Sequence, residues 1–410
     1  LITTQQLRAL GFTDLSRVRV HGYGGREIPL ELNSSYVDDL PEQPSVQTSK
    51  GIVFFGVDNV TWKAGQSGNN MYYERTVNPY SEESYYFITE SDEPRLVPEA
   101  ASAGTPGSTV KTSFFDVLLH EKNLAFAGET GRCMYGEDFR AQTSQTFPFT
   151  LTGASGVTKV RVVFGSKISG VAGKVGVSLN GEEQPNAITL TPTTDYANVA
   201  RGTFNYTADG EKLNVGLRYT SQGGVLSMAR LDYIQVEYVR PLHLNGGELY
   251  FRDPNAGRVS YTLSGCSADT QVWDVTNPAY PALVTGSLEG DKLTFVSPGT
   301  GYREYVAFNP AQVSRPVKPA GRVQNQDLHA MEVPDMVIIT PSAWKSEAER
   351  LAQFRREHDA MVVHVFTPEE VYNEFSSGSA DIGAFRKALK MWCGEDRFLS
   401  FAQFRQFIQL

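Results

Sequence analysis

The amino-acid sequence predicts a mainly β protein of several domains. An N-terminal β-rich domain, a β-sandwich or jelly-roll domain and a small β unit are followed by a truncated α/β segment. Three observations support this prediction. The 410 residues exceed what one domain usually holds. The 37 Gly, 21 Pro, 23 Phe and 19 Tyr favour many short strands joined by turns. Near residue 334 the pattern changes to continuous apolar strands that alternate with helices.

Residues 1–142 are predicted to form the N-terminal β-rich domain with a connector arm. Thr3 precedes a short apolar face that ends at Gly11, which indicates a brief helix. Residues 99–110 are rich in Ala, Gly, Ser and Pro and predict an exposed loop. Residues 114–122 suit a short helix or an extended arm that packs on its neighbours. The candidate strands are residues 18–20, 51–57 and 84–89.

Residues 143–242 give the clearest β pattern and predict a β-sandwich, jelly-roll-like domain. Asn180-Gly181 and Asp209-Gly210 supply residues that adopt positive φ angles in tight hairpins. Residues 231–238 alternate apolar and polar positions, as a half-buried strand does. Regularly spaced short strands over about a hundred residues are typical of a sandwich. The seven candidate strands are residues 146–151, 159–164, 174–179, 187–190, 202–206, 212–218 and 229–239.

Residues 243–330 are predicted to be a small β domain followed by a linker. Asn277-Pro278 and Ser297-Pro298-Gly299 mark turns between its strands. Residues 315–333 begin with Arg-Pro-Val-Lys-Pro and lack apolar periodicity, which indicates the linker. The candidate strands are residues 247–252, 258–264, 271–274, 292–295 and 304–308.

Residues 331–410 are predicted to be an incomplete α/β subdomain. Continuous apolar strands at 335–340 and 361–366 are each followed by a helical pattern, as in a parallel sheet. Ser342 is the expected cap of the first helix. Thr367 and Pro368 begin a second helix, and residues 381–392 form a third. Two parallel strands bury their faces poorly, so the sequence looks cut short, and residues after 392 are expected to lack a sheet to complete.

Composition excludes several functional classes. The formal net charge is −9 and no run of Lys and Arg occurs, which argues against a nucleic-acid partner. No apolar stretch of 18 residues is present, so no membrane-spanning helix is expected. Cys133, Cys266 and Cys393 are too few and too scattered for a disulfide framework or a thiolate metal site. The chain begins with Leu1 rather than Met, as a trimmed sequence would.

No residue pattern predicts a catalytic, cofactor-binding or metal site. The glycines between positions 22 and 25 lie in a β context and favour a turn over a phosphate loop. Asp38 and Asp39 would suit Ca²⁺ chemically, but a solvated acidic turn is the favoured interpretation.

The cysteine and histidine candidates also have plain structural interpretations. Asp327 and His329 could belong to a catalytic dyad only if a cysteine lay beside the histidine. A structural contact of the linker is therefore the favoured interpretation. His120 beside Glu121 favours packing or hydrogen bonding. Cys393 follows a helix near the end of the chain. Cys133 and Cys266 are expected to act as small hydrophobic residues.

The order of several segments resembles a known family. The segments are residues 323–329, 334–340, 348–352, 371–378 and 381–391. Together they resemble the junction and first half of a gingipain-type cysteine peptidase domain, most closely the sortase of the type IX secretion system in Bacteroidetes. Weaker likenesses in the same order extend the resemblance over roughly residues 5–396.

The resemblance implies a cell-surface or outer-membrane-associated protein whose catalytic domain uses a Cys–His dyad. Family members trim secreted cargo and join it to surface lipopolysaccharide. The family's His and Cys lie further along the chain, no His follows His364, and Cys393 comes too early. The chain is therefore expected to be an inactive N-terminal portion, ended by a truncation or frameshift, that positions the peptidase domain or binds cargo.

The alternative hypothesis is a cell-surface adhesion or binding module that recognises glycan or protein through the β-sandwich. Its aromatic platform would use Tyr196, Tyr206, Tyr219 and Tyr233, although core packing is the commoner role of such side chains. The partners expected under these hypotheses are secreted cargo proteins or surface glycan and lipopolysaccharide. The chain is expected to be exported and peripheral to the outer membrane rather than spanning it.

Overall fold

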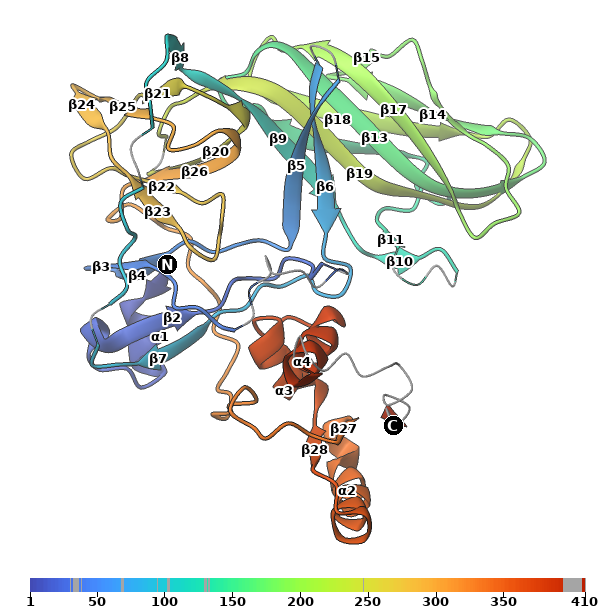
Figure 1. Cartoon of the computed structure of the whole chain (residues 1–410). Coiled ribbons are helices and arrows are strands. Elements are labelled where there is room, and N and C mark those ends of the chain that lie inside the picture. The colour runs from blue at the N-terminus through green and yellow to red at the C-terminus, as the bar shows by residue number, and fades with distance from the viewer. Residues whose placement is uncertain are drawn as a thin grey trace.

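The computed structural model describes the chain except residues 30, 32–36, 38, 68–69, 94, 102–103, 129–130, 132, 246, 394–407 and 410. In Figure 1 the β-sandwich and a small β unit lie side by side at the top. The N-terminal strands lie below the small unit, and the α/β segment projects from the bottom. The fold is mainly β with few helices, as predicted.

The N-terminal region surrounds one short helix. The helix α1 (Thr4–Ala9) begins at a capping box, in which Thr3 and Gln6 satisfy each other's backbone amides, as the predicted Thr cap requires. Gly11 follows the helix with φ +99°. The strands form sheets in the orders β1-β4-β3 and β2-β7. Their bounds are β1 Ile2–Thr3, β2 Val18–His21, β3 Ser45–Thr48, β4 Gly51–Phe54 and β7 Phe87–Glu90, with the 3₁₀ helix η1 at Leu15–Arg17.

A long hairpin that the sequence did not predict leaves this region and reaches the β-sandwich (Figure 1). Its strands are β5 (Val60–Ser67) and β6 (Asn70–Val77). Tyr73 is fully buried where the hairpin meets the sandwich. Its amide donates to Glu237 at 2.8 Å, and its carbonyl accepts from the side chain of Gln235 at 2.8 Å. The hairpin therefore ties the N-terminal region to the sandwich.

Residues 99–121 differ in part from the prediction. The expected loop is largely exposed, as predicted, but it also pairs with the small β unit, because Ala101 donates to the Leu283 carbonyl at 2.7 Å and Leu283 donates to Glu99 at 2.8 Å. Strand β8 (Thr109–Lys111) pairs in parallel with that unit. The expected helix or arm at 114–122 is strand β9 (Ser113–Glu121), because it finds a ladder partner in the sandwich. Hydrogen bonds thus cross the predicted boundary at 142.

The β-sandwich has two sheets, in the orders β12-β18-β14-β15, with β16 on β14, and β17-β13-β19-β9. All seven predicted strands are present. Phe164, Val177 and Ile234 are fully buried between the sheets, where each such side chain contributes about 1.5–3 kcal/mol. The strand bounds are β12 Ser144–Thr150, β13 Ser155–Ser169, β14 Gly173–Leu179, β15 Glu182–Glu183, β16 Ile188–Leu190, β17 Asn198–Thr207, β18 Lys212–Thr220 and β19 Val225–Pro241.

The two predicted hairpin turns of the sandwich have different conformations. Asn180 and Gly181 have φ angles of +50° and +87°, as a tight turn between twisted strands requires. The prediction was wrong for Asp209-Gly210, because neither residue has a positive φ. The connection there runs over residues 208–211, which is long enough to avoid the strained two-residue geometry.

The small β unit consists of two further sheets, in the orders β20-β26-β22-β23 and β24-β25-β21-β8. An aromatic core holds them together, in which Phe251 lies 5.0 Å from Tyr305 and 5.7 Å from Tyr261 between ring centroids. All five predicted strands are present. The bounds are β20 Glu248–Ala256, β21 Val259–Leu263, β22 Gln271–Asp274, β23 Ala282–Val284, β24 Ser287–Glu289, β25 Lys292–Val296 and β26 Gly301–Phe308.

A short hairpin lies by the sandwich and is separate from the small β unit. Its strands are β10 (Ala125–Phe126) and β11 (Met134–Tyr135).

The linker after β26 stays largely exposed but is hydrogen-bonded along the N-terminal helix. The Val317 amide donates to the Leu1 carbonyl at 2.9 Å, and Gln6 donates to the Val317 carbonyl at 2.6 Å. Arg322 donates to the Leu10 carbonyl at 2.7 Å. These contacts carry the chain past the N-terminal region before it enters the α/β segment.

The α/β segment contains the two predicted parallel strands and three helices. Thr367 caps α3 through a capping box with Glu370, with Pro368 at the first helical position. Ser342 was wrongly expected to cap the first helix, since a 3₁₀ turn (η2, Ser342–Trp344) precedes α2 and no side chain caps either one. The bounds are β27 Met336–Ile339, α2 Lys345–Asp359, β28 Val363–Phe366, α3 Pro368–Phe375, α4 Gly383–Cys393 and β29 Ile408–Gln409, which also pairs in parallel with β27.

Candidate functional site at the junction of the N-terminal region and the α/β segment

Buried polar side chains join the N-terminal region to helices α3 and α4. We call this set the junction clasp. It consists of Gly22, Tyr23, Ile28, Ser377, Asp381 and Lys387. Its two sides are more than 340 residues apart in sequence but in direct contact, at the place where α3 and α4 lie beneath the N-terminal strands in Figure 1.

Ser377 lies in the turn after α3, with φ +52°. Its Oγ accepts from the Tyr23 amide at 3.2 Å and donates to the Tyr85 carbonyl at 2.8 Å. Gly22 has φ +123°, and a Cβ there would lie 2.4 Å from Ser377 Oγ. Only glycine combines that backbone conformation with so close an approach. The predicted glycine turn is therefore also half of an interdomain contact.

Lys387 is the buried cation of the clasp, with only 1% of its surface exposed. Its ammonium donates to the Tyr23 hydroxyl and to the Phe375 carbonyl, both at 3.0 Å, and lies 4.9 Å from the centre of the Tyr23 ring. The Tyr23 hydroxyl donates to the same carbonyl at 2.7 Å. A cation without water needs such partners, so the contact between the two regions also stabilises this charge.

Asp381 is the buried anion of the clasp. Its two oxygens accept from the Ile28 amide at 2.9 Å and the Gly383 amide at 2.7 Å. Burial raises the pKa of Asp381, while the two amides and the charge of Lys387 act in the opposite direction. A Cβ on Gly383 would lie 2.7 Å from that of Ile28, so the start of α4 needs a glycine at this contact.

The Asp327-Leu328-His329 segment meets α3 rather than a cysteine. Glu374, which is buried, accepts from the Leu328 amide at 2.8 Å and lies 2.8 Å from His329 Nδ1. The His329 ring stacks on Phe375 with 4.8 Å between centroids. Asp327 accepts from the Ala330 amide at 2.9 Å. This arrangement fastens the linker to the back of the clasp.

The three cysteines form no disulfide and lie in three separate environments. Burial raises the pKa of Cys266, which lies in the core of the small β unit, and of Cys393, the last residue of α4. A nucleophilic cysteine needs its pKa lowered by neighbouring positive charge. Cys133 is exposed beside the β10–β11 hairpin. The environments of Cys266 and Cys393 therefore favour unreactive thiols.

The other histidine and acidic candidates also have structural partners. His120 lies 3.0 Å from Glu137 and against the Phe147 ring, not beside Glu121. His364 Nε2 lies 2.8 Å from the Glu332 carbonyl. Asp38 lies outside the described residues. Within the described part of the chain, no group of three His, Cys, Asp or Glu side chains is placed to hold a metal ion.

A second charged cluster lies where the β5–β6 hairpin crosses the sandwich. Arg75 pairs with Glu121 at 3.0 Å and with Asp232 at 3.2 Å, and its guanidinium lies 3.9 Å from the centre of the Tyr233 ring. Burial raises the pKa of Glu121 to about 7, against the lowering effect of Arg75. Burial also raises the pKa of Asp232. Arg75 thus forms ion pairs with two carboxyl groups that are largely shielded from water.

The four tyrosines of the proposed aromatic platform do not share a surface. Tyr219 is buried in the sandwich core, and Tyr233 lies under Arg75. The Tyr206 hydroxyl bonds to Asn180 and Asp209 at a turn. Tyr196 alone of the four is largely exposed and lines a pocket.

The fold and the junction define a class of protein: a mainly β region that continues into the opening strands and helices of a parallel α/β domain. Residues 329–398 match the sequence profile of Peptidase family C25. The chain is similar to dimeric latent PorU from Porphyromonas gingivalis, with 29% identity, a TM-score of 0.83 and coverage of 95% of this chain. The predicted resemblance is confirmed by both findings. The chain spans 38% of the length of that PorU chain.

Two shorter structures also match part of the chain. A family 35 carbohydrate binding module from Clostridium thermocellum is 12% identical and matches with a TM-score of 0.21, covering 30% of this chain and 90% of its own. CBM35 from Cellvibrio japonicus Abf62 is 18% identical, with a TM-score of 0.21 and coverage of 32% of this chain and 91% of its own. Comparison with curated proteins found no match.

Sequence reasoning missed the clasp because its partners are distant in the chain. Lys387 looks like a solvated helix residue, and Asp381 looks like an ordinary residue before a helix. The signal that was available is the set of glycines at 22, 24 and 25, which marks a close backbone approach as well as a turn.

Proposed function

We propose that this chain is the non-catalytic N-terminal region of a gingipain-like cysteine peptidase that resembles the type IX secretion sortase, and that it positions the peptidase domain. The observation that carries the proposal is the junction clasp. The clasp fixes α3 and α4, in the part of the chain that matches Peptidase family C25, against the N-terminal strands. A cysteine peptidase needs its nucleophile, base and oxyanion hole within a few tenths of an ångström, so a fixed starting edge serves that purpose.

The buried charges support a permanent rather than a transient contact. A small shift of one side would leave Lys387 buried without the Tyr23 hydroxyl and the Ile28 amide buried without Asp381. A buried charge that loses its partner costs several kcal/mol, so partly opened arrangements are disfavoured. We therefore infer that the α/β segment moves as one body with the N-terminal region.

Catalysis is assigned to residues outside this chain, and the chain by itself is expected to cleave no peptide. The test is incubation of the protein with peptide substrates, with and without iodoacetamide. Substrate cleavage that thiol alkylation blocks would contradict the proposal. Protection of the α3–α4 amides from hydrogen exchange tests the positioning role directly, and rapid exchange there would argue against it.

The proposed location is the cell surface or the outer membrane, following the similarity to PorU. Among the described residues, no helix is long and apolar enough to cross a membrane. Secreted cargo is the proposed partner of the β domains. A pull-down with cargo tails, run beside a glycan array, separates this role from the alternative of a surface module, since binding to sugars alone would favour the module.

A further inference from the structure

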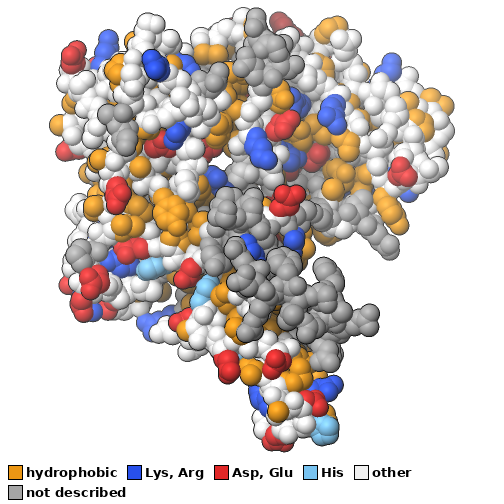
Figure 2. Space-filling view, viewed as in Figure 1, with side chains coloured by type: hydrophobic (Ala, Val, Ile, Leu, Met, Phe, Trp, Pro, Cys, Tyr) orange, Lys and Arg blue, Asp and Glu red, His pale blue; other side chains and the backbone are white. Residues whose placement is uncertain are grey.

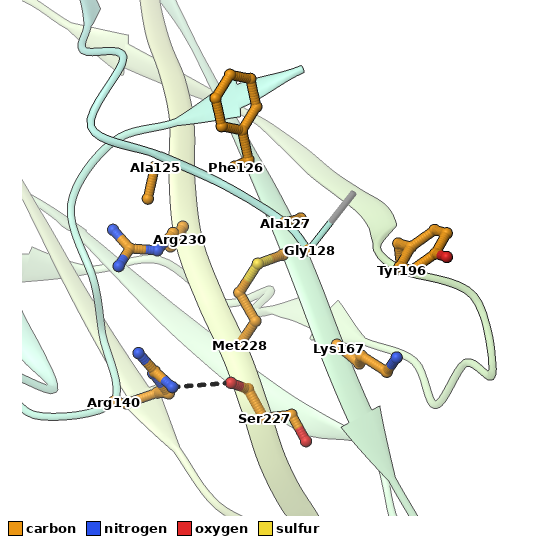
Figure 3. A pocket seen from close by; sticks show the side chains of 10 residues that line it. All are labelled: Ala125, Phe126, Ala127, Gly128, Arg140, Lys167, Tyr196, Ser227, Met228 and Arg230. Atoms are coloured by element: carbon orange, nitrogen blue, oxygen red, sulfur yellow. Dashed lines mark hydrogen bonds between the residues drawn. The ribbon is translucent and has the colours of Figure 1, made fainter. Parts of the chain in front are cut away.

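A pocket of about 230 Å³ lies on the β-sandwich, away from the junction clasp. We call it the sandwich pocket, and its main lining side chains are Phe126, Arg140, Lys167, Tyr196, Met228 and Arg230. They come from the β10 strand, the segment before β12, strand β13, the loop before β17 and strand β19 (Figure 3). Five separate stretches of chain thus converge on one hollow.

Two exposed aromatic rings stand at the walls of the pocket (Figure 3). Phe126 and Tyr196 are 51% and 55% exposed, whereas Met228 is buried at the floor. Gly128, with φ +62°, lies under Tyr196, and a Cβ there would be 3.1 Å from the ring. The close backbone approach supports Tyr196 in an outward position. Exposed rings held in this way offer their electron-rich faces to a ligand.

The charged side chains of the pocket are all cationic. Arg140 and Arg230 share a single carboxylate, Asp138, at 2.6 Å and 3.2 Å. Arg140 also donates to the Ser227 carbonyl at 3.0 Å, and Arg230 to the Gly136 carbonyl at 2.8 Å. One carboxylate against two guanidinium groups leaves a net positive charge. Because their hydrogen bonds already hold them, both groups are pre-organised for an anion.

Lys167 adds a second net positive charge and links the cations to the ring. Its ammonium lies 5.8 Å from the centre of the Tyr196 ring. No carboxylate among the described residues lies within salt-bridge distance of it, unlike the two arginines. This positive pocket occurs on a chain whose formal net charge is −9, so the charge is local to the site.

We propose that the sandwich pocket binds an anionic sugar, a pyranose ring that carries a carboxylate or phosphate group. The C–H face of the ring would lie against Tyr196, and the anionic group would take hydrogen bonds from Lys167 beside that ring, while Arg140 and Arg230 on the other side of the pocket add positive potential (Figure 3). The volume lies below the range of about 300–1,000 Å³ found for pockets that bury drug-sized ligands, which fits a single sugar unit. This inference is independent of the proposed positioning role, since the pocket shares no residue with the clasp.

The experiment is isothermal titration of the whole chain with glucuronic acid, glucose 6-phosphate, glucose and inorganic phosphate. Either acidic sugar is expected to bind at least about tenfold more tightly than glucose or phosphate, because ring and charge contribute together. The affinity should fall as NaCl rises from 20 to 300 mM, since the cations are solvent-accessible. Equal binding of glucose would overturn the anionic part, and equal binding of phosphate would overturn the sugar part.

Matched variants locate the binding. Tyr196→Ala and Lys167→Met should each weaken the acidic sugar by about fivefold or more. The controls are Tyr280→Ala, an equally exposed tyrosine in the small β unit, and Lys174→Met, an exposed lysine on β14, which should leave the affinity unchanged. Equal losses in variant and control, or tighter binding of an acidic peptide than of any sugar, would refute the assignment.

Discussion

Replacement of Asp381 by alanine tests the energetics of the junction clasp most sharply. The carboxylate accepts from the Ile28 and Gly383 amides, and the residue is 1% exposed. Alanine leaves both amides buried without an acceptor. Each unsatisfied donor costs about 1–3 kcal/mol, so the expected loss of docking free energy for the two amides is about 2–6 kcal/mol. That loss corresponds to an increase of about thirtyfold to about twenty-thousandfold in the opening equilibrium.

The assay is native-state hydrogen exchange, because a protein of several domains has no single unfolding free energy. Peptides that cover residues 22–29 and 368–393 should exchange faster in Asp381→Ala, whereas peptides from the sandwich core should not change. Asp269→Ala is the control, since Asp269 is exposed on the small β unit and its loss should cost less than about 0.5 kcal/mol. Exchange in Asp381→Ala that matches this control would refute the reasoning.

Three further predictions follow from the described contacts. The free energy of local opening where the β5–β6 hairpin meets β9 should fall by about 2–3 kcal/mol as pH rises from 5 to 8, because burial raises the pKa of Glu121 from 4.5 to about 7 and the folded state therefore resists its ionisation. Glu121→Gln should flatten that slope in native-state hydrogen exchange at the two pH values, corrected for the intrinsic pH dependence of exchange, and an unchanged slope would contradict this. Gly22→Ala should cost at least about 1–2 kcal/mol of docking free energy, because Gly22 has a φ of +123° and an alanine Cβ there would clash with Ser377. The amides of residues 376–380 should then exchange faster, and protection equal to wild type would contradict the assigned contact. Glu374→Ala should speed exchange of the Leu328 amide about tenfold or more, while an unchanged rate would show that the linker is held by other contacts.

Local patterns were enough to predict most strands and the capped helices. Thr3 and Thr367 cap their helices because a cap depends on residues three apart, and Asn180-Gly181 forms its turn for the same local reason. Strand β9 was missed because its apolar residues also suit a helix, and only its partner β19 decides between them. The hairpin β5–β6 was missed because its sequence lacks clear alternation.

The candidate site could not be predicted because long-range contacts create it. Lys387 and Tyr23 are in contact although they lie 364 positions apart in the sequence, and no local sequence pattern near either residue indicates the other. The predicted boundaries at 142, 242 and 330 stay predictions, although the contacts of β8 and β9 show that the first boundary does not separate independent ladders. The resemblance to a gingipain-type domain came from ordered sequence segments, which short-range patterns alone would not have supplied.

The central claim is that this region holds the opening of the α/β domain in a fixed position. It is tested most directly by the distance between spin labels at Glu90 on β7 and Gln353 on α2, both exposed, after Cys133, Cys266 and Cys393 are replaced. One narrow distance distribution is expected in the otherwise native chain, and a broad one is expected when Asp381→Ala is added. A broad distribution before that substitution would contradict the claim.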